Sequence, residues 1–137
     1  MNSTDDRPWR QYLFRSHLAE ACRYKTFASL VQPSRTRNAA HGIGGCLLFD
    51  GQRFCQLIEG PAVAAAMLWQ RIGRDPRHRD VRMLLDRLTA APDEPARWSY
   101  GYCGADDLDC FDTPTLLQGP AALAAFDAIR ARADLAL

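Results

Sequence analysis

The sequence predicts an α+β fold, specifically a ferredoxin-like βαββαβ sheet with an extra strand and a C-terminal helical cap. Two observations predict it: short apolar runs and helical patterns follow one another in the order βαββαβ, and an alanine-rich helical stretch closes the chain. The 137 residues suffice for one domain with its own core, but not for two. We expect a flexible N-terminus over residues 1–9, one domain over 10–104 and the helical cap over 105–137.

The first strand is predicted over residues 11–16, where QYLFRS forms a run of aromatic and apolar residues. A helix over 24–37 follows, because its apolar residues recur at helical spacing. Pro33 either kinks this helix or restarts it in a new first turn. The run GIGGCLLF, residues 42–49, then predicts the second strand.

A tight hairpin is predicted next, because Asp50-Gly51 joins the second strand to a third, QRFCQLIEG, over 52–60. A two-residue turn fixes the cross-strand partners. These are Phe49 with Gln52, Leu47 with Phe54, and Cys46 with Cys55. Side-chain alternation places Gln56 on the face of Leu47 and Phe54, and both cysteines on the opposite face.

The second half of the chain predicts a helix, two strands and the cap. Pro61 opens a helix over 61–74 that stops near Asp75-Pro76, and strands follow over 81–88 and within 95–104. In the alanine-rich cap, an apolar side recurs every three residues at Leu123, Phe126 and Ile129. We expect the two earlier helices on one face of the sheet and the C-terminal helix on the other.

Charge and composition exclude several classes of protein. The net charge of +1, with both signs spread along the chain, indicates neither a nucleic-acid nor a membrane surface. The N-terminus is polar and no apolar run is long enough for a membrane helix, so a cytoplasmic location is expected. The three histidines are far apart and the five cysteines lack CxxC spacing, which favours reduced thiols over a metal site. No nucleophile with a nearby base is evident, so we expect no enzymatic activity.

Gln56 is the first candidate functional residue, because it places an uncharged amide in a strand otherwise built for burial. A buried amide without a hydrogen-bond partner costs roughly 1–3 kcal/mol, so such a side chain usually faces a polar group. Two interpretations remain open from the strand pattern alone. Gln56 is either a core glutamine that bonds to backbone, or a residue that faces a ligand.

Three segments together resemble the BLUF family of blue-light sensors that bind FAD: RNAAHGIGGCLLFDGQRFCQLIEG, RIGRDPRHRDV and RWSYGY. The resemblance runs without gaps from about residue 10 to 102, which makes 10–104 a BLUF-like flavin-binding domain. It implies that FAD, with FMN as the alternative, lies between the two helices on the Gln56 face. Gln56 would be the switch amide beside flavin N5 and O4; an amide both donates and accepts hydrogen bonds, as that flavin edge requires.

The resemblance also implies the other cofactor-binding residues. Asn38 would hold the carbonyl and imide edge of the ring with Arg37 beside it, although Asn38 also fits a helix C-cap. The remaining matches are Ile43, Phe54, Arg71, Asp75, Arg77 and His78. For Arg71 and Asp75, a solvated helix end is an equally good interpretation.

The sequence departs from the family at the first strand, where a Tyr-x-Ser pattern supplies a photoactive tyrosine and this chain has Phe14-Arg15-Ser16. Without a hydroxyl, Phe14 can neither hydrogen-bond Gln56 nor supply a proton, so the usual photocycle should be absent or severely impaired. Tyr100 follows Trp98 at the position where methionine is common, and it either substitutes as donor or fills space. The switch region thus comprises Phe14, Gln56, Trp98 and Tyr100.

Three functional hypotheses follow. The first is a BLUF-type regulatory sensor that signals through a protein partner or through self-association, as a homo-oligomer. The second is a degenerate BLUF fold that has lost flavin and serves as an interaction module. The third is a thiol sensor, because the predicted pairing of Cys46 with Cys55 gives a Cα separation of roughly 4.5 Å, close to disulfide geometry.

Overall fold

The computed structural model describes residues 8–22, 29, 36–94, 97–112 and 116–136. Its elements are β1 (Pro8–Leu18), η2 (Glu20–Cys22), β2 (Gly44–Phe49), β3 (Arg53–Pro61), α2 (Ala62–Ile72), β4 (His78–Ala90), β5 (Trp98–Tyr102), η3 (Asp109–Phe111), α3 (Gly119–Arg132) and β6 (Asp134–Ala136). The predicted helix over 24–37 lies largely outside the described residues, but 36–40 are helical. In the described ranges, no helix is long and apolar enough to cross a membrane.

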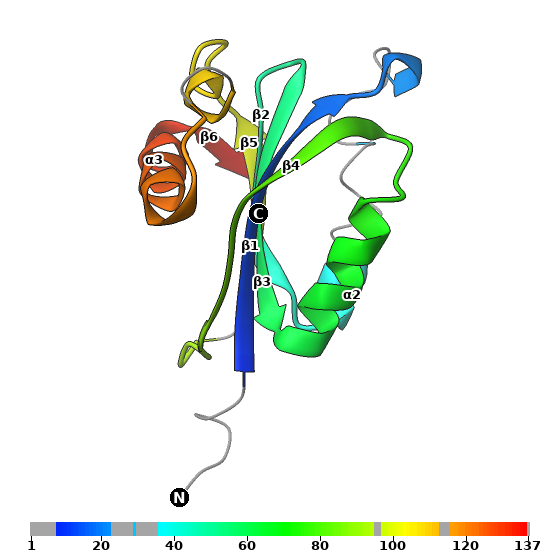
Figure 1. The fold of residues 1–137 in the computed structure, drawn as a ribbon, viewed down its shortest axis with the longest axis vertical. Helices are drawn as coiled ribbons and strands as arrows, with labels where there is room; N and C mark the ends of the chain where they lie inside the picture. Colours follow the sequence, from blue (N-terminus) through cyan, green and yellow to red (C-terminus); the bar gives the residue numbers. More distant parts are fainter. Residues whose placement is uncertain (1–7, 23–28, 30–35, 95–96, 113–115, 137) are drawn as a thin grey trace, which may run out of the picture.

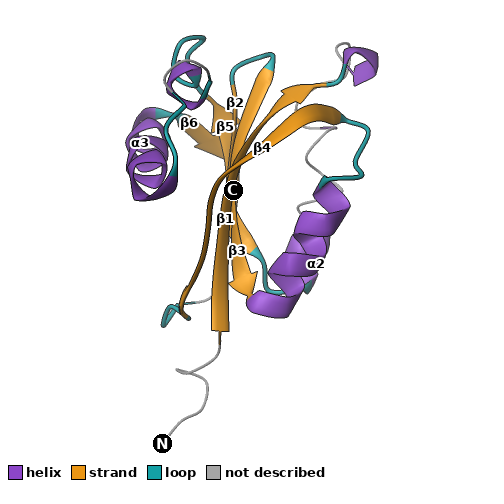
Figure 2. Cartoon of the chain, viewed as in Figure 1, coloured by secondary structure: helices purple, strands orange, loops and turns teal. Residues whose placement is uncertain are grey.

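One mixed sheet carries the fold, and Figure 2 shows its strands running through the centre of the molecule. The strand order is β4-β1-β3-β2-β5-β6. β1 pairs antiparallel with β3 and β4, β2 pairs antiparallel with β3, and β5 runs parallel to β2. The first four strands have the ferredoxin-like order, and β5 is the predicted extra strand. The fold prediction is therefore confirmed.

Helices cover the two faces of the sheet as predicted, with α2 on one side and α3 on the other (Figure 1). The core beneath α2 contains Phe14, Leu47 and Phe54, whereas the core beneath α3 contains Cys46 and Cys55. Because both faces are covered, the central strands are apolar on both sides. The face assignments from side-chain alternation are confirmed.

The end of the chain differs from the prediction. The C-terminal helix was expected to continue to the end of the cap, but α3 stops at Arg132 and β6 follows. Ala133 has extended backbone, with φ −80° and ψ 157°, which turns the chain back toward the sheet. β6 then pairs antiparallel with the otherwise free edge of β5. Backbone hydrogen bonds at a sheet edge thus outweigh the helical propensity of an alanine-rich sequence. At the other end, β1 takes in Pro8 and Trp9, the last residues of the segment predicted to be flexible.

The turn between β2 and β3 also differs from the prediction. Asp50 N donates to Arg53 O at 3.1 Å, so the central turn residues are Gly51 and Gln52 rather than Asp50 and Gly51. Gly51 has φ 100°, at the position where a type II′ turn requires glycine. The Asp50 carboxylate accepts hydrogen bonds from the backbone N–H groups of Gln52 and Arg53, at 2.9 and 2.6 Å. These hydrogen bonds from the turn backbone to the Asp50 side chain fix the turn at Gly51 and Gln52.

The predicted cross-strand partners are consequently wrong by two residues. Cys46 pairs with Leu57, and Cys55 pairs with Leu48. A slip of two residues keeps every side chain on its face, which explains why the face assignments survive. Cys46 and Cys55 become diagonal neighbours, roughly 7–8 Å apart, beyond the reach of a disulfide without backbone movement. The register therefore removes the basis of the thiol-sensor hypothesis.

We expect the cysteines to react slowly with iodoacetamide in the native protein at neutral pH. Burial raises the pKa of Cys55 well above its ordinary value, and burial raises that of Cys103 to about 11. The thiolate fraction of Cys103 then falls about 100-fold below that of a free cysteine. Mass spectrometry of peptides labelled before and after unfolding checks this. A Cys46–Cys55 cross-link in oxidised native protein would contradict the observed register.

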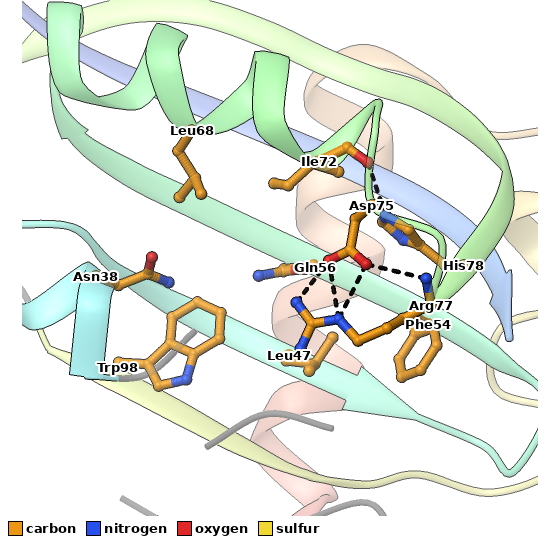
Figure 3. Close-up of a pocket in the computed structure, with 10 residues that line it drawn as sticks. All are labelled: Asn38, Leu47, Phe54, Gln56, Leu68, Ile72, Asp75, Arg77, His78 and Trp98. Atoms are coloured by element: carbon orange, nitrogen blue, oxygen red, sulfur yellow. Dashed lines mark hydrogen bonds and ion pairs between the residues drawn. The ribbon is translucent and has the colours of Figure 1, made fainter. Parts of the chain in front are cut away.

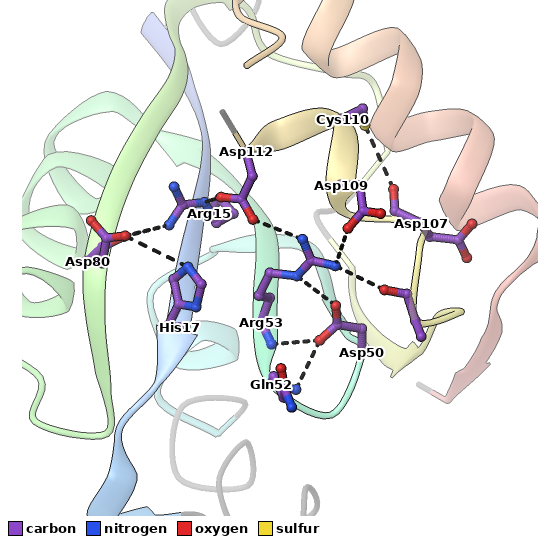
Figure 4. Close-up of polar contacts among 11 residues, drawn as sticks. Arg15, His17, Asp50, Gln52, Arg53, Asp80, Asp107, Asp109, Cys110 and Asp112 are labelled. Carbon is purple, nitrogen blue, oxygen red and sulfur yellow. Dashed lines mark hydrogen bonds and ion pairs between the residues drawn. The ribbon is translucent and has the colours of Figure 1, made fainter. Parts of the chain in front are cut away.

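A buried arginine joins the central strand β1 to the segment that precedes α3 (Figure 4). Arg15 is 2% exposed, and its Nη1 lies 3.0 Å from Asp80 O and 3.1 Å from Asp80 Oδ2. Its Nε lies 2.8 Å from Asp112 Oδ1 without the angle of a hydrogen bond, so this contact is an ion pair only. Arg15 thus lies between two carboxylates that come from distant parts of the sequence.

A second arginine, Arg53 at the start of β3, completes this network. Arg53 Nη1 lies 2.8 Å from Asp112 Oδ2, and the same guanidinium reaches Asp50 and Asp109, each at 2.8 Å. The two oxygens of Asp112 therefore contact two different arginines, Arg15 from β1 and Arg53 from β3. Asp112 therefore links the cap to both β1 and β3, whereas Asp109 links it to β3 alone.

Candidate functional site

Gln56 lies in a row of side chains that crosses the centre of the sheet. In this row Gln56 of β3 is directly opposite Phe14 of β1 and Leu47 of β2, and Leu47 is in turn opposite Tyr100 of β5. Phe14 is fully buried. Tyr100 was expected on a strand near Gln56, but β2 separates them by two strand spacings, about 9.6 Å. Phe14 is therefore the aromatic residue of the switch region that adjoins Gln56.

A cavity of about 70 Å³ opens between this face of the sheet and α2 (Figure 3). It brings together residues that the sequence assigned to a cofactor. The predicted residues in its wall are Asn38, Phe54, Gln56, Asp75, Arg77, His78 and Trp98. They come from five segments of the chain, which the fold brings together at this cavity.

Three further residues line the cavity without having been predicted as site residues: Leu47, Leu68 and Ile72. Leu68 and Ile72 are four residues apart on α2 and so share one side of the helix. Of the three, Leu47 was predicted to lie on the Gln56 face, from side-chain alternation. Periodicity alone does not give the position of the helix relative to the sheet, so the sequence could not show that these three side chains line one cavity.

Several polar groups in the cavity wall have no hydrogen-bond partner among the described residues. Within the part of the chain that the structure describes, neither the Gln56 nor the Asn38 side chain makes a hydrogen bond, although Asn38 is only 2% exposed. Trp98 Nε1 is buried and also has no partner among the described residues. Buried polar groups are normally hydrogen-bonded, so the buried Asn38 amide and Trp98 indole, beside the half-buried Gln56, indicate a polar ligand. The interpretation of Gln56 as a core residue bonded to backbone finds no support in the described ranges.

The donor set around the cavity fits the heterocyclic edge of a flavin. The Gln56 and Asn38 amides each donate and accept, and the Trp98 indole donates. A flavin presents carbonyl oxygens, an imide N–H and ring nitrogens along that edge. Its three rings need more than 70 Å³, and two adjoining cavities of about 250 and 380 Å³ extend the space. No group of side chains with the arrangement of a metal site occurs among the described residues.

Asp75 and Arg77 form an ion pair at the rim of this cavity. Arg77 Nε lies 2.9 Å from Asp75 Oδ2, and the Arg77 backbone N–H donates to Asp75 Oδ1, also at 2.9 Å. Burial acts to raise the pKa of Asp75, but the hydrogen bonds from Arg77 outweigh it, and the pKa lies below its ordinary value. Asp75 is therefore ionised at neutral pH, and the pair presents little net charge to the cavity.

His78 connects three elements around the cavity rather than offering a free nitrogen. Its Nε2 lies 2.9 Å from Ile72 O at the end of α2, and its Nδ1 lies 2.9 Å from Ser16 Oγ in β1. A carbonyl oxygen only accepts, so Nε2 carries the proton, and in the neutral ring Nδ1 accepts from the Ser16 hydroxyl. This makes His78 a positioning residue that holds α2 against β1.

The remaining predicted residues, Arg37, Ile43 and Arg71, lie beside the first cavity. All three line the 380 Å³ cavity, and both arginines also line the 250 Å³ cavity. The structure therefore places every predicted cofactor residue on one of three cavities that share lining residues, but separates these three from the space next to Gln56.

The comparison with protein families agrees with this geometry. The family model of BLUF, "Sensors of blue-light using FAD", matches residues 10–99. Since this is well over half of the chain, the protein belongs to the BLUF family. It is a flavin-binding sensory protein of the type that responds to blue light.

Curated relatives are much longer than this chain. The "Blue light- and temperature-regulated antirepressor BluF" of Escherichia coli (strain K12) is 36% identical over 73 residues, which cover 53% of this chain and 18% of the relative. The "Photoactivated adenylate cyclase subunit beta" of Euglena gracilis is 41% identical over 54 residues, 39% of this chain and 6% of the relative. The match is thus confined to a small part of each relative.

Solved structures match over more of the chain. "BlrB - a BLUF protein, dark state structure" has a TM-score of 0.67 and 27% sequence identity, covering 91% of this chain and 96% of the other. "Klebsiella pneumoniae BlrP1 with FMN and cyclic diGMP, no metal ions" has a TM-score of 0.59 and 27% identity, covering 88% of this chain and 30% of the other. The similarity to BlrB therefore extends over nearly the whole of both chains.

Proposed function

We propose that this chain binds the ring of FAD or FMN in the cavity beside Gln56 and acts as a BLUF-type sensor whose tyrosine-dependent light response is impaired. The observation that carries the proposal is the direct opposition of Gln56 and Phe14 on neighbouring strands, at the edge of a cavity whose two amides make no hydrogen bond with any described residue. Gln56 and Asn38 would hold the polar edge of the flavin, and Ile72 would pack against the ring. FMN is included because a BLUF relative has been solved with it.

When bound, the flavin supplies blue-light absorption. The protein's part is to hold the ring, to exclude water from it and to offer the Gln56 amide as a group that can exchange hydrogen bonds. A tyrosine beside that amide could donate a proton; Phe14 cannot. The ring of Phe14 instead fills the position and meets Trp69 edge-on, with centroids 5.2 Å apart.

Output from the site would pass through protein contacts in this proposal, either to a partner or within a homo-oligomer. β3 carries Gln56 and begins at Arg53, which contacts Asp112 of the cap. A change at the site can therefore reach the cap through one strand and one ion pair. The antirepressor and cyclase relatives are chains far longer than the part that matches here.

The decisive experiment is the visible absorption spectrum of purified protein loaded with FAD, in the dark and after blue light. We expect flavin bands that do not undergo a reversible red shift, because Phe14 offers Gln56 no hydroxyl. A Gln56→Leu variant is the matched control, since it should bind flavin more weakly and also show no shift. A shift in the wild-type protein would contradict the impaired response and make Tyr100 the donor to test.

A second candidate function is a flavin-free interaction module, favoured by one observation: the cavity beside Gln56 measures only about 70 Å³. Protein that remains colourless after incubation with FAD and gel filtration would support this alternative. The family membership and the fold would be unaffected, and function would depend on protein contacts alone.

A further inference from the structure

β4 is the outermost strand of the sheet beside β1. It runs over 13 residues, from His78 to Ala90, and within the described ranges no strand pairs with its outer edge. Alternate backbone N–H and C=O groups along such an edge point away from the sheet and can bond to an added strand. The length and openness of this edge suit the attachment of an extended segment.

Three arginines of β4, Arg79, Arg82 and Arg87, lie on the α3 side of the sheet and are called here the arginine row. Their partners on β1 lie an even number of residues from Leu13, which belongs to the core beneath α3. Strict alternation from Arg79 would turn Arg82 to the other face, but the register of the β1–β4 pairing shifts twice, and a bulge can re-aim a side chain in this way. The pairs are Arg79 with His17, Arg82 with Arg15, and Arg87 with Gln11.

The two aspartates of β4 do not neutralise the arginine row, because arginines of β1 already bind them. Asp80 Oδ2 lies 3.1 Å from Arg15 Nη1, a contact visible in Figure 4. Arg10 Nε donates to Asp86 Oδ1 and Arg10 Nη2 donates to Asp86 Oδ2, both at 2.9 Å. Both carboxylates of β4 therefore compensate charges of the neighbouring strand.

The arginine row has no other carboxylate partner among the described residues. The side chains of Arg79 and Arg82 make neither a hydrogen bond nor an ion pair there, and Arg87 Nε donates to the uncharged Gln11 Oε1 at 2.7 Å. Arg79 and Arg87 are exposed, and Arg82 is half-buried. Three positive charges thus follow one edge of the sheet without compensation, although the whole chain carries a net charge of only +1.

The charge on this edge determines which kind of strand can pair with it. A second copy of β4 would bring its own three arginines alongside, and like charges opposite one another destabilise a strand pair. An acidic strand would instead gain charge-assisted hydrogen bonds at the same positions. The edge therefore disfavours self-pairing and favours a segment of opposite charge, a combination that gives specificity.

We propose that β4 binds an extended acidic segment of a partner protein, added antiparallel to its free edge. Side chains on this face are about 6.8 Å apart, at roughly 3.4 Å per residue, and Leu85 lies between Arg82 and Arg87. At every second position the segment therefore carries an acidic residue, an apolar residue and two further acidic residues. Leu85 offers no aromatic surface on which a base could stack, which favours a peptide over single-stranded nucleic acid. This inference goes beyond the proposed function, because it requires no bound flavin.

The test measures binding of the fluorescein-labelled heptapeptide Glu-Thr-Leu-Thr-Glu-Thr-Glu to the full chain in the dark by fluorescence anisotropy. Glutamine in place of the three glutamates should weaken binding more than about tenfold, since exposed ion pairs contribute about threefold each. The same residues in the order Glu-Glu-Glu-Thr-Thr-Thr-Leu should bind about fivefold more weakly, because their carboxylates do not match the arginine row. No binding, or equal binding of both acidic peptides, would overturn the inference and leave the proposed function untouched.

Variants test the arginine row directly. Arg79→Gln and Arg82→Gln should each weaken binding of the acidic heptapeptide by about threefold, and the double variant by about tenfold. Arg97→Gln is the matched control and should change nothing, because Arg97 is exposed and precedes β5, which three strands separate from β4. An equal loss for Arg97→Gln, equally tight binding of oligothymidylate, or a self-association that Arg79→Gln abolishes would overturn the assignment to an acidic partner segment.

Discussion

Phe14→Tyr is expected to give the flavin-loaded protein a reversible red shift under blue light. Phe14 lies directly opposite Gln56 and is fully buried, so a phenol placed there must find its hydrogen bond inside the protein. The Gln56 amide makes no hydrogen bond among the described residues and is the neighbouring candidate. Tyrosine adds one oxygen to a ring of the same shape, at a stability cost of about 1 kcal/mol or slightly more. Difference spectra between dark and illuminated samples measure the result.

Two controls isolate this effect. Phe49→Tyr adds a hydroxyl to the same face of the sheet, but Phe49 stacks on Phe54 and is not opposite Gln56, so no shift is expected. In the double variant with Gln56→Leu, the restored response should disappear. If flavin-loaded Phe14→Tyr shows no shift, the missing hydroxyl is not the cause of the impairment, and Tyr100 is the departure from the family to test next.

Asp112→Ala is expected to lower the free energy of unfolding by about 3 kcal/mol, because it removes one of the two carboxylates that compensate the charge of a buried arginine. Arg15 is 2% exposed, but it would still be paired with Asp80. The expected loss of stability therefore lies at the low end of the range for broken buried ion pairs. The same substitution removes one partner of Arg53, which keeps its contacts with Asp109 and Ala105 O of the cap. Urea denaturation with comparison of m-values measures the change.

Asp86→Ala is the matched control for this prediction. Asp86 forms a pair with Arg10 at 2.9 Å, but both side chains are about one-third exposed, so we expect a loss below about 1 kcal/mol. Arg15→Met combined with Asp112→Leu should recover much of the stability, because two apolar side chains replace the buried charges. A loss for Asp112→Ala no larger than that for Asp86→Ala would show that Asp112 does not hold the cap.

The sequence alone determined the element order and the faces of the central strands. Alternation of apolar and polar positions is a local property of a strand, so it survives an error of two residues in register. For the same reason Gln56 was placed correctly on the face beneath α2. The resemblance to the BLUF family then supplied the identities of residues that the structure collects around the cavities.

Only the tertiary structure decided the partners of those residues. Asp50 moved the turn by bonding to backbone N–H groups, which changed the neighbours of both core cysteines. The pairing of Arg15 with Asp80 and Asp112 joins positions 65 and 97 residues apart in the chain, and β6 forms because β5 has a free edge. Such contacts depend on which distant groups meet after folding, and no local pattern contains that information, because side-chain periodicity reports the direction of a residue but not what it faces.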